Sequence, residues 1–336
     1  MNNPVSGLLG SCQVAGRVAG LLAGLLAGLL AGACGDAADP TAVASTDAIA
    51  VATPAQLPAS VPASLSGRLD CLRENAGAVV IAHRGGPTRE YPENAMETLQ
   101  RTLEAGASAM EVDIAQSKDG VLFLMHDDDL DRTSTGEGPL ADRTWDEIKA
   151  LDLETYQSKT AYHPPTLDQA LDWAVANKVL LELNRKRSTP VEKVIAAVRA
   201  RKAENNVFII TYTDDQAVEL HQAAPDLVIT ASVDSIEKLG ELLSRGVVAE
   251  RLVAWTGMAT PDPTLWKALA DRGVESIFGT QNARDTQRDS DFWEDDDGSE
   301  YNGLVAGGLA FIVTGYSDKV SRQLSASDGV RKACGL

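Results

Sequence analysis

The sequence predicts an α/β protein of the TIM (β/α)8 barrel class, with a short β-hairpin after the second strand. Two observations support this. Short runs of β-branched and other apolar residues alternate with segments of helical pattern, as in parallel β/α folds. The region they occupy, residues 69–336, has the length of one such barrel domain. The runs cover residues 78–83, 109–114, 121–126, 179–184, 207–212, 227–232, 252–257, 275–280 and 310–315.

These runs are one more than a closed eight-stranded barrel needs, and the second and third runs explain the excess. The segment between them is too short for a crossover helix. Its Asp119–Gly120 pair is a preferred two-residue hairpin turn. We therefore expect the third run to fold back antiparallel on the second, which leaves eight parallel strands.

This hairpin would gather chemically active side chains. With Asp119 and Gly120 as the turn, Asp113 lies opposite His126, and directly paired residues have Cβ atoms about 5 Å apart. Glu111 shares a face with Asp113 because side chains alternate along a strand. The sequence therefore predicts two carboxylates and an imidazole in one cluster.

The first helix of the predicted barrel follows Asn94 in the segment AMETLQRTLEAG. Glu97 lies three residues after Asn94, and Gly106 ends the segment, which is typical of a capping pair and a glycine stop. We expect Asn94 to serve mainly as the helix N-cap.

The acidic charge of the chain excludes some classes of partner. The formal net charge is −18 at pH 7. Nucleic-acid binding needs clustered Lys and Arg, and adsorption to anionic lipid also needs basic charge. A small anionic substrate remains compatible where cations or a metal gather locally.

The N-terminus reads as an export signal. Arg17 precedes an uncharged Ala/Gly/Leu repeat that ends in small residues and Cys34. We expect residues 1–33 to be a lipoprotein-type signal peptide and Cys34 to be lipidated, with residues 34–68 as a disordered Ala/Pro/Ser/Thr-rich tether. The protein would then lie in the periplasm or cell envelope, attached to the membrane by its lipid. A plain signal peptide or a membrane helix are the alternatives.

Two cysteines remain in the predicted barrel domain, Cys71 before the first strand and Cys334 near the C-terminus. Exported proteins fold in an oxidising compartment. The first and last strands of a closed barrel are neighbours, so we expect a Cys71–Cys334 disulfide. Two separate thiols are the alternative.

Several segments, taken together, resemble the glycerophosphodiester phosphodiesterase family. They are AHRGG, YPENAMETL, EVDIAQSKDGVLFLMHD, DRTSTGEG, PPTLDQAL and LLELN, and they cover most of residues 78–184. The resemblance implies a barrel of the PLC-like phosphodiesterase type that holds a divalent cation, Ca²⁺ or Mg²⁺. It also implies metal-dependent hydrolysis of small glycerophosphodiesters to sn-glycerol 3-phosphate and an alcohol.

The resemblance also implies roles for individual residues. Two histidines would be the general acid and base; we assign His83 as base and His126 as acid, although the reverse remains open. The cation ligands would be Glu111, Asp113 and Glu182, with Arg84 on the phosphate and Trp255 in the substrate pocket. Three carboxylates suit a hard cation better than zinc, and histidine exchanges protons near neutral pH.

Three positions depart from the family pattern. Asn184 stands where a lysine is usual, Ala95 replaces a threonine, and Gly315 replaces an aspartate. Two alternatives stay open. Related barrels share these parts and a membrane anchor would give access to lipid, so one alternative is a phospholipase D-type activity on lysophospholipids or sphingolipids. The three departures favour the other, a catalytically weak surface lipoprotein that binds phosphate-bearing ligands.

An acidic segment, residues 284–303, separates the last two strands. Its aspartates do not have the spacing of a calcium-binding loop. We interpret it as a solvated insertion at the rim of the pocket, with Trp293 and Tyr301 as candidate lid residues.

Overall fold

The computed structural model describes residues 57–282 and 288–336. Every predicted strand is present there. The strands are β1 (Val79–Ala82), β2 (Ala109–Gln116), β3 (Leu122–Leu124), β4 (Leu180–Arg185), β5 (Val207–Ile210), β6 (Val228–Ser232), β7 (Leu252–Trp255), β8 (Glu275–Gly279) and β9 (Phe311–Thr314).

The parallel strands close into a barrel. They follow the order β1-β9-β8-β7-β6-β5-β4-β2, and β1 also pairs with β2, so the sheet returns to its first strand. The extra strand β3 runs antiparallel to β2 and extends the sheet beside the barrel. The predicted TIM barrel with a hairpin after its second strand is confirmed.

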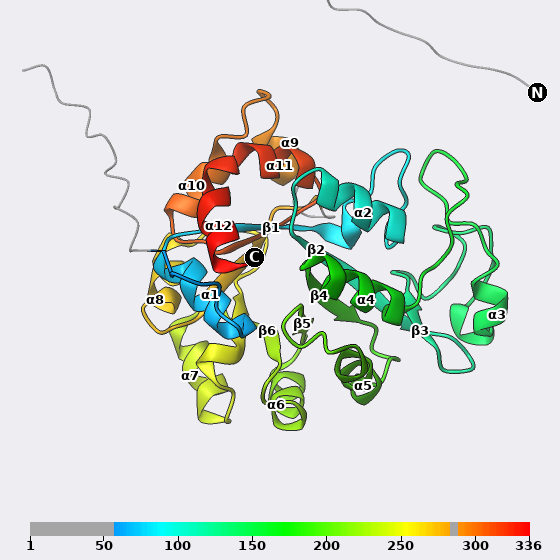
Figure 1. Ribbon diagram of the computed structural model, residues 1–336, viewed down its shortest axis with the longest axis horizontal. Coiled ribbons are helices and arrows are strands. Elements are labelled where there is room, and N and C mark those ends of the chain that lie inside the picture. Colours follow the sequence, from blue (N-terminus) through cyan, green and yellow to red (C-terminus); the bar gives the residue numbers. More distant parts are fainter. Residues whose placement is uncertain (1–56, 283–287) are drawn as a thin grey trace, which may run out of the picture. The chain divides into compact units, whose positions relative to one another are not determined.

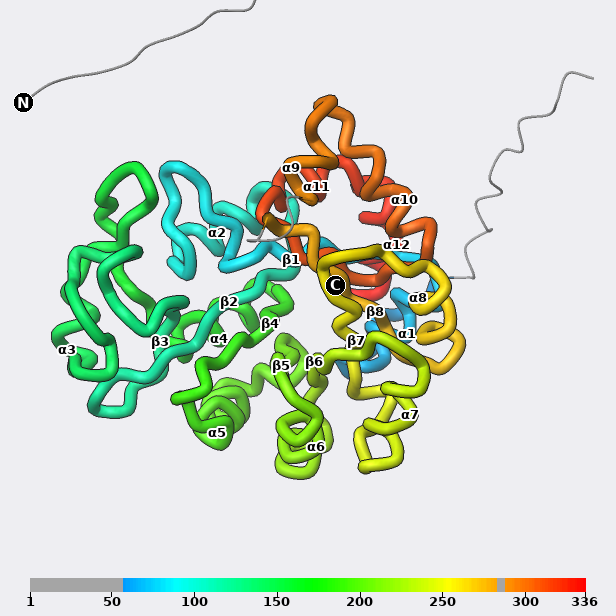
Figure 2. Tube along the Cα trace, turned by 180° about the vertical axis from the view of Figure 1, so that it is seen from behind, coloured from blue at the N-terminus to red at the C-terminus, as the bar shows by residue number. Residues whose placement is uncertain are grey.

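Helices alternate with the strands and cover the outside of the barrel (Figures 1 and 2). Their apolar faces pack on the outward-facing side chains of the strands, as in other β/α barrels. They are α1 (Leu65–Glu74), α2 (Met96–Glu104), α3 (Trp145–Ile148), α4 (Leu167–Asn177), α5 (Val191–Arg201), α6 (Asp214–Ala223), α7 (Ile236–Ser244), α8 (Pro263–Ala270), α9 (Arg288–Phe292), α10 (Glu300–Ala306), α11 (Ser317–Gln323) and α12 (Asp328–Cys334).

Helix α1 packs on the barrel interior. Its side chains Leu65, Leu69 and Leu72 are buried in one cluster with inward-facing residues such as Phe208 and Phe311. Because α1 is part of this core, the folded domain includes Leu65. The predicted boundary at residue 69 is therefore four residues too late.

A disulfide joins α1 to α12, the last helix. It links Cys71 and Cys334, whose Cα atoms are 5.6 Å apart, and this is the pairing expected from the sequence. The predicted signal peptide, Cys34 and most of the predicted tether lie outside the described residues. Across the ranges that the structure does describe, no helix combines the length and apolar character that a membrane span requires.

The β2–β3 hairpin differs from its predicted register by one residue. Ile114 pairs with Leu124, and the Met125 N–H donates to the Asp113 carbonyl at 3.0 Å. The turn has three residues rather than two, because Ser117 and Val121 close it and Gly120 adopts a positive φ of 91°. Asp113 is thus opposite Met125, and the predicted pairing of Asp113 with His126 is wrong.

The insertion between β8 and β9 is more deeply packed than predicted. Asp289 and Tyr301 are fully buried, and Tyr301 packs in a cluster with Trp266 and Phe278. The acidic stretch 294–297 is exposed, as expected, and so are residues 291, 299, 300, 302 and 303. Tyr301 is therefore a core residue and not a lid.

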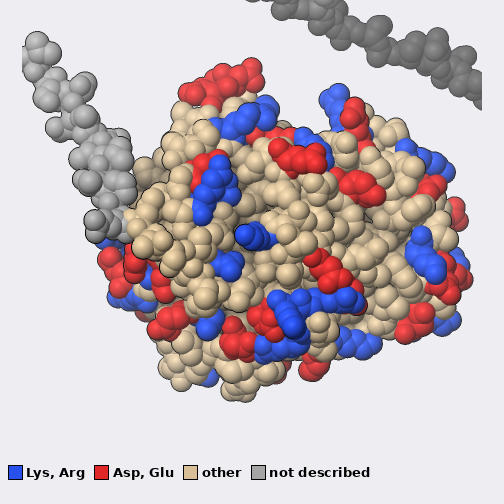
Figure 3. Space-filling model, in the orientation of Figure 1, with Lys and Arg blue, Asp and Glu red and all other residues tan. Residues whose placement is uncertain are grey.

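Acidic and basic side chains are interspersed over the face shown in Figure 3. Among the described residues, exposed ion pairs join side chains of neighbouring helices and loops. Arg199 of α5 pairs with Asp226, and Arg245 pairs with Asp215 of α6 at 2.6 Å. Exposed pairs of this kind contribute little to stability, about 0–1 kcal/mol each.

Candidate active site

The site is a cavity of about 200 Å³ at the C-terminal ends of the barrel strands. This is the end at which β/α barrels carry their chemistry. Each parallel strand, or the segment directly after it, contributes to the lining. The lining residues are His83, Glu111, Glu182, Asn184, Ile210, Thr211, Tyr212, Thr230, Ser232, Trp255, Gln281 and Val313. Of the predicted site residues, His83, Glu111, Glu182 and Trp255 therefore line one cavity.

His83 occupies a tight turn directly after β1. The turn, η1 (His83–Gly85), places Arg84 at a positive φ of 53°, a strained conformation for a side chain other than glycine. The Arg84 N–H donates to Glu111 Oε2 at 2.7 Å and stabilises this conformation. The next position favours glycine, because Gly85 has a positive φ of 82° and a Cβ there would lie 2.7 Å from Leu99 Cδ2. Burial, followed by the charge of Arg84, lowers the pKa of His83 to about 4, so its imidazole is neutral at pH 7.

Three buried carboxylates lie side by side on β2 and β4. The strand register places Glu111 opposite Glu182, and Asp113 follows two residues after Glu111 on the same face. All three are at most 3% exposed. Burial raises the pKa of Glu111, and burial with the adjacent Glu111 charge raises that of Glu182 well above its ordinary value. The same two causes raise the pKa of Asp113 to about 7.

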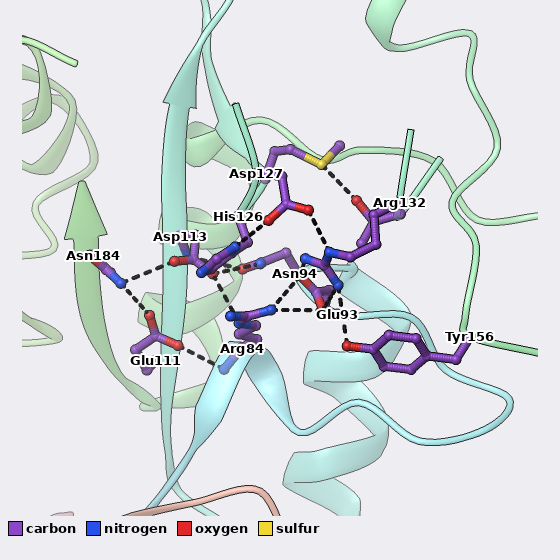
Figure 4. Close-up of polar contacts among 12 residues, drawn as sticks. Arg84, Glu93, Asn94, Glu111, Asp113, His126, Asp127, Arg132, Tyr156 and Asn184 are labelled. Atoms are coloured by element: carbon purple, nitrogen blue, oxygen red, sulfur yellow. Dashed lines mark hydrogen bonds and ion pairs between the residues drawn. The ribbon is translucent and has the colours of Figure 1, made fainter. Parts of the chain in front are cut away.

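Asn184 connects two of these carboxylates. Its amide nitrogen donates to Glu111 Oε1 and to Asp113 Oδ1, both at 3.0 Å. Its amide oxygen accepts a hydrogen bond from the Tyr212 hydroxyl at the mouth of the cavity. The residue that departs from the family pattern is therefore built into the acidic cluster (Figure 4).

Asn94 is not the helix N-cap that we predicted. The N-cap of α2 is Ala95, which has no side-chain hydrogen bond, and Asn94 has a positive φ of 58°. The Asn94 amide instead donates to Asp113 Oδ2 and accepts from the Asp113 N–H, each at 2.9 Å. Two bonds to a buried carboxylate residue outweigh the modest gain from a cap.

The Arg84 guanidinium is paired inside the protein. It donates two hydrogen bonds of 3.1 Å to the Glu93 carboxylate, and its buried Nε has no hydrogen-bond partner among the described residues. Arg84 is not among the residues that line the cavity. Its contact with a substrate phosphate therefore remains a prediction.

His126 follows β3 and lies beside the barrel, and it is not among the residues that line the cavity. Figure 4 shows its imidazole next to Asp113. Its Nδ1 lies 2.6 Å from Asp127 Oδ1, and about a third of the side chain is exposed. Burial and Arg84 are the larger causes that lower the pKa of His83, and a positive charge on His126 lowers it further. The two histidines therefore lie within range of each other's charge.

A family model for the glycerophosphoryl diester phosphodiesterase family matches residues 83–283, more than half of the chain. The chain belongs to this family. The recognition made from its sequence motifs is confirmed, and so is the expectation of an enzyme of the family.

Curated relatives of this family member show moderate identity. The chain is 31% identical over 164 residues to uncharacterized protein YqiK of Bacillus subtilis, covering 46% of this chain and 67% of YqiK. It is 32% identical over 158 residues to a glycerophosphodiester phosphodiesterase of Caldanaerobacter subterraneus, covering 45% and 65%. The match thus spans about two thirds of the length of these relatives.

Solved structures share the fold. A glycerophosphoryl diester phosphodiesterase from Parabacteroides distasonis superposes with a TM-score of 0.70 at 27% identity, covering 80% of this chain and 93% of the other. An Oleispira antarctica phosphodiesterase, solved with the product sn-glycerol-3-phosphate, has the same fold at 22% identity and a TM-score of 0.55, covering 75% and 99%.

The acidic cluster has the chemistry of a hard-cation site. Over residues 57–282 and 288–336, no three His, Cys, Asp or Glu side chains are spaced to hold a metal ion as they stand. Glu182 is nevertheless buried, faces another carboxylate, and accepts no hydrogen bond from the described residues. An unpaired buried carboxylate is costly. The oxygen-only donor set therefore fits a divalent cation such as Ca²⁺ or Mg²⁺.

Sequence reasoning missed several residues of this family member's site. Tyr212 was seen only as the end of a strand run, although a tyrosine at a strand end is a usable signal. Asp127 directly follows His126, and that pairing could have been proposed from the sequence. Glu93 and Arg132 could not, because only the fold brings together positions 39 residues apart.

Proposed function

We propose that the protein hydrolyses glycerophosphodiesters to sn-glycerol 3-phosphate and an alcohol. The observation that carries this proposal is the cavity itself, where a neutral imidazole and paired carboxylates meet at the end of the barrel used for catalysis. Family membership and the names of the relatives support the same substrate class.

His83 is proposed as the general base. Its burial keeps the imidazole unprotonated at neutral pH, so it can accept the proton of the attacking hydroxyl, from water or from the substrate glycerol. The bond from phosphorus to the leaving oxygen then breaks. If the glycerol hydroxyl attacks first, a water molecule completes the hydrolysis.

His126 is proposed as the general acid. Asp127 accepts from its Nδ1, which leaves Nε2 as the nitrogen that would donate a proton to the leaving oxygen.

Glu111, Asp113 and Glu182 would hold the divalent cation. When bound, the cation screens the phosphodiester charge and stabilises charge that develops on the phosphoryl oxygens. Asn94 and Asn184 orient the carboxylates through their hydrogen bonds. Ca²⁺ and Mg²⁺ both suit this donor set.

The size of the cavity favours small, deacylated substrates over lysophospholipids or sphingolipids. Its volume of about 200 Å³ accommodates a glycerol-sized group. No Lys or Arg is found among its lining residues, and most of the strands contribute short polar or aromatic side chains. We therefore rank the phospholipase D-type activity second.

Replacing either histidine tests the proposal. His83→Ala and His126→Ala should each lower kcat/KM on glycerophosphocholine by about 100-fold or more, because general acid–base catalysis contributes about that much. His163→Ala is the matched control, since His163 is exposed away from the cavity. Circular dichroism should show that all three variants fold. Near-normal turnover in either of the first two would refute the assignment.

We also propose that the protein is exported and lipidated at Cys34. The Cys71–Cys334 disulfide supports an oxidising compartment. Mass spectrometry of the mature N-terminus from the native host tests this, and an N-terminal residue other than a lipid-modified Cys34 would contradict it.

A further inference from the structure

A chain of charged side chains runs from His126 to Arg84 beside the cavity (Figure 4). It starts at the imidazole, where Asp127 Oδ1 lies 2.6 Å from Nδ1. A carboxylate can only accept, so Nδ1 carries a proton and Nε2 is the nitrogen that takes up and donates the second proton. Asp127 therefore selects which nitrogen of His126 faces the reaction.

Asp127 is in turn held by Arg132. The Arg132 Nε donates to Asp127 Oδ2, so the two oxygens of this carboxylate are divided between His126 and Arg132. Burial alone would raise the pKa of Asp127, but the hydrogen bonds from Arg132 and His126 outweigh it and lower the pKa to about 2. Asp127 is thus ionised and fixed in orientation at neutral pH.

Arg132 has a second, buried partner. Its terminal nitrogens bind both oxygens of Glu93, at 2.7 and 2.9 Å, in the two-pronged geometry that guanidinium groups favour with carboxylates. Glu93 is only 7% exposed and also accepts both side-chain hydrogen bonds of Arg84. Arg84 adjoins His83, so this one carboxylate connects the turn that carries the first histidine with the segment that carries the second.

We propose that Asp127 and Arg132 are positioning residues for His126, with Glu93 as the buried junction that fixes Arg132. Through them, the segment after β3 holds the acid with Nε2 directed at the substrate. The role in turnover rests on the proposed function, whereas the choice of tautomer does not. None of the three residues needs to touch the substrate.

Two variants of the full-length protein test the Asp127 contact. Asp127→Ala should lower kcat on glycerophosphocholine by about 10- to 100-fold while KM changes less than about threefold, since a misoriented acid affects the chemical step. Asp127→Asn retains an acceptor and should lose less. Nitrogen-15 NMR of labelled histidine, recorded at a pH where the His126 ring is neutral, should show the Nδ1–H tautomer in the parent and a mixture in Asp127→Ala.

Arg132→Met tests the next link, and Arg199→Met is its control. Arg199 also pairs with an aspartate, but its side chain is exposed and does not line the cavity, so its loss should leave kcat unchanged. Arg132→Met should lower kcat by about five- to 20-fold, with Arg132→Lys intermediate because it keeps the charge without the fork.

An unaltered His126 tautomer in Asp127→Ala would overturn the proposal. So would a kcat within twofold of the parent for both Asp127→Ala and Arg132→Met. If the parent itself shows no turnover, the proposed function fails, but the NMR measurement still decides whether Asp127 sets the tautomer.

Discussion

At the scale of single residues, the site depends on buried carboxylates whose charged forms are disfavoured by burial. Glu182 is the clearest case, because it is buried opposite Glu111 and accepts no hydrogen bond from the described residues. Such a group lowers the stability of the protein in the absence of a cation. A bound cation would offset this loss of stability, because it would neutralise the buried negative charge.

Replacing Glu182 should separate stability from cation binding. Its pKa is raised in the folded state by burial and Glu111, so its contribution to stability is fully present below the unfolded value near pH 4.5 and is lost as pH rises. In EDTA, Glu182→Gln should therefore gain stability over the parent as pH rises above about 5, reaching about 1–3 kcal/mol. Added Ca²⁺ should raise the melting temperature of the parent but not that of Glu182→Gln.

Denaturant unfolding at several pH values and thermal melts with and without Ca²⁺ would measure both effects. Glu192→Gln, an exposed change on α5, is the control. Equal Ca²⁺ stabilisation of the parent and Glu182→Gln would contradict the role of Glu182 as a cation ligand.

The positions of the three acidic residues were predictable, because side chains alternate between the two faces of a strand. Glu111, Asp113 and Glu182 follow from side-chain alternation on strands with buried neighbours. Asn94 was misassigned because its capping pattern is local, whereas its true partner, Asp113, lies 19 residues away and meets it only through the fold. Local patterns cannot weigh such a competing contact.

At the scale of elements, the strands were predictable and the connections were not. Short apolar runs are a strong signal of buried strands, and the structure has a strand within each predicted run. Hairpin register depends on whether the turn holds two or three residues, and Asp119–Gly120 is compatible with both. One additional turn residue moved His126 out of its expected pairing.

The β8–β9 insertion offers a test at this scale. Asp289 of α9 is fully buried and accepts hydrogen bonds from Tyr301 Oη at 2.6 Å, Thr314 Oγ1 at 2.8 Å and the Gly315 N–H at 2.7 Å. Asp289→Ala leaves two buried hydroxyl donors and the partly buried Gly315 N–H without an acceptor, so we expect a loss of about 2–4 kcal/mol in urea unfolding.

Asp295→Ala is the matched control, because Asp295 is exposed in the same insertion. It should change stability by less than about 0.5 kcal/mol. If Asp289→Ala were as mild as its control, the insertion would be the solvated segment that its acidic composition suggested.

At the scale of the whole molecule, barrel closure explains why distant segments cooperate. β1 pairs with both β9 and β2, so the turn that carries His83 lies between the first carboxylate strand and the last strand. The same closure brings the two ends of the domain together, where the disulfide joins α1 to α12. The barrel class was predictable from alternation and length, whereas the packing of α1 on the interior was not, because its leucines resemble those of any amphipathic helix.

The most direct test of the account is turnover of glycerophosphocholine by the purified protein, followed by release of sn-glycerol 3-phosphate, with Ca²⁺, with Mg²⁺ and after exhaustive EDTA treatment. Lysophosphatidylcholine serves as the competing substrate. We expect turnover that needs a divalent cation and prefers the deacylated substrate. Full activity in EDTA, or no activity on glycerophosphodiesters with either ion, would contradict the account.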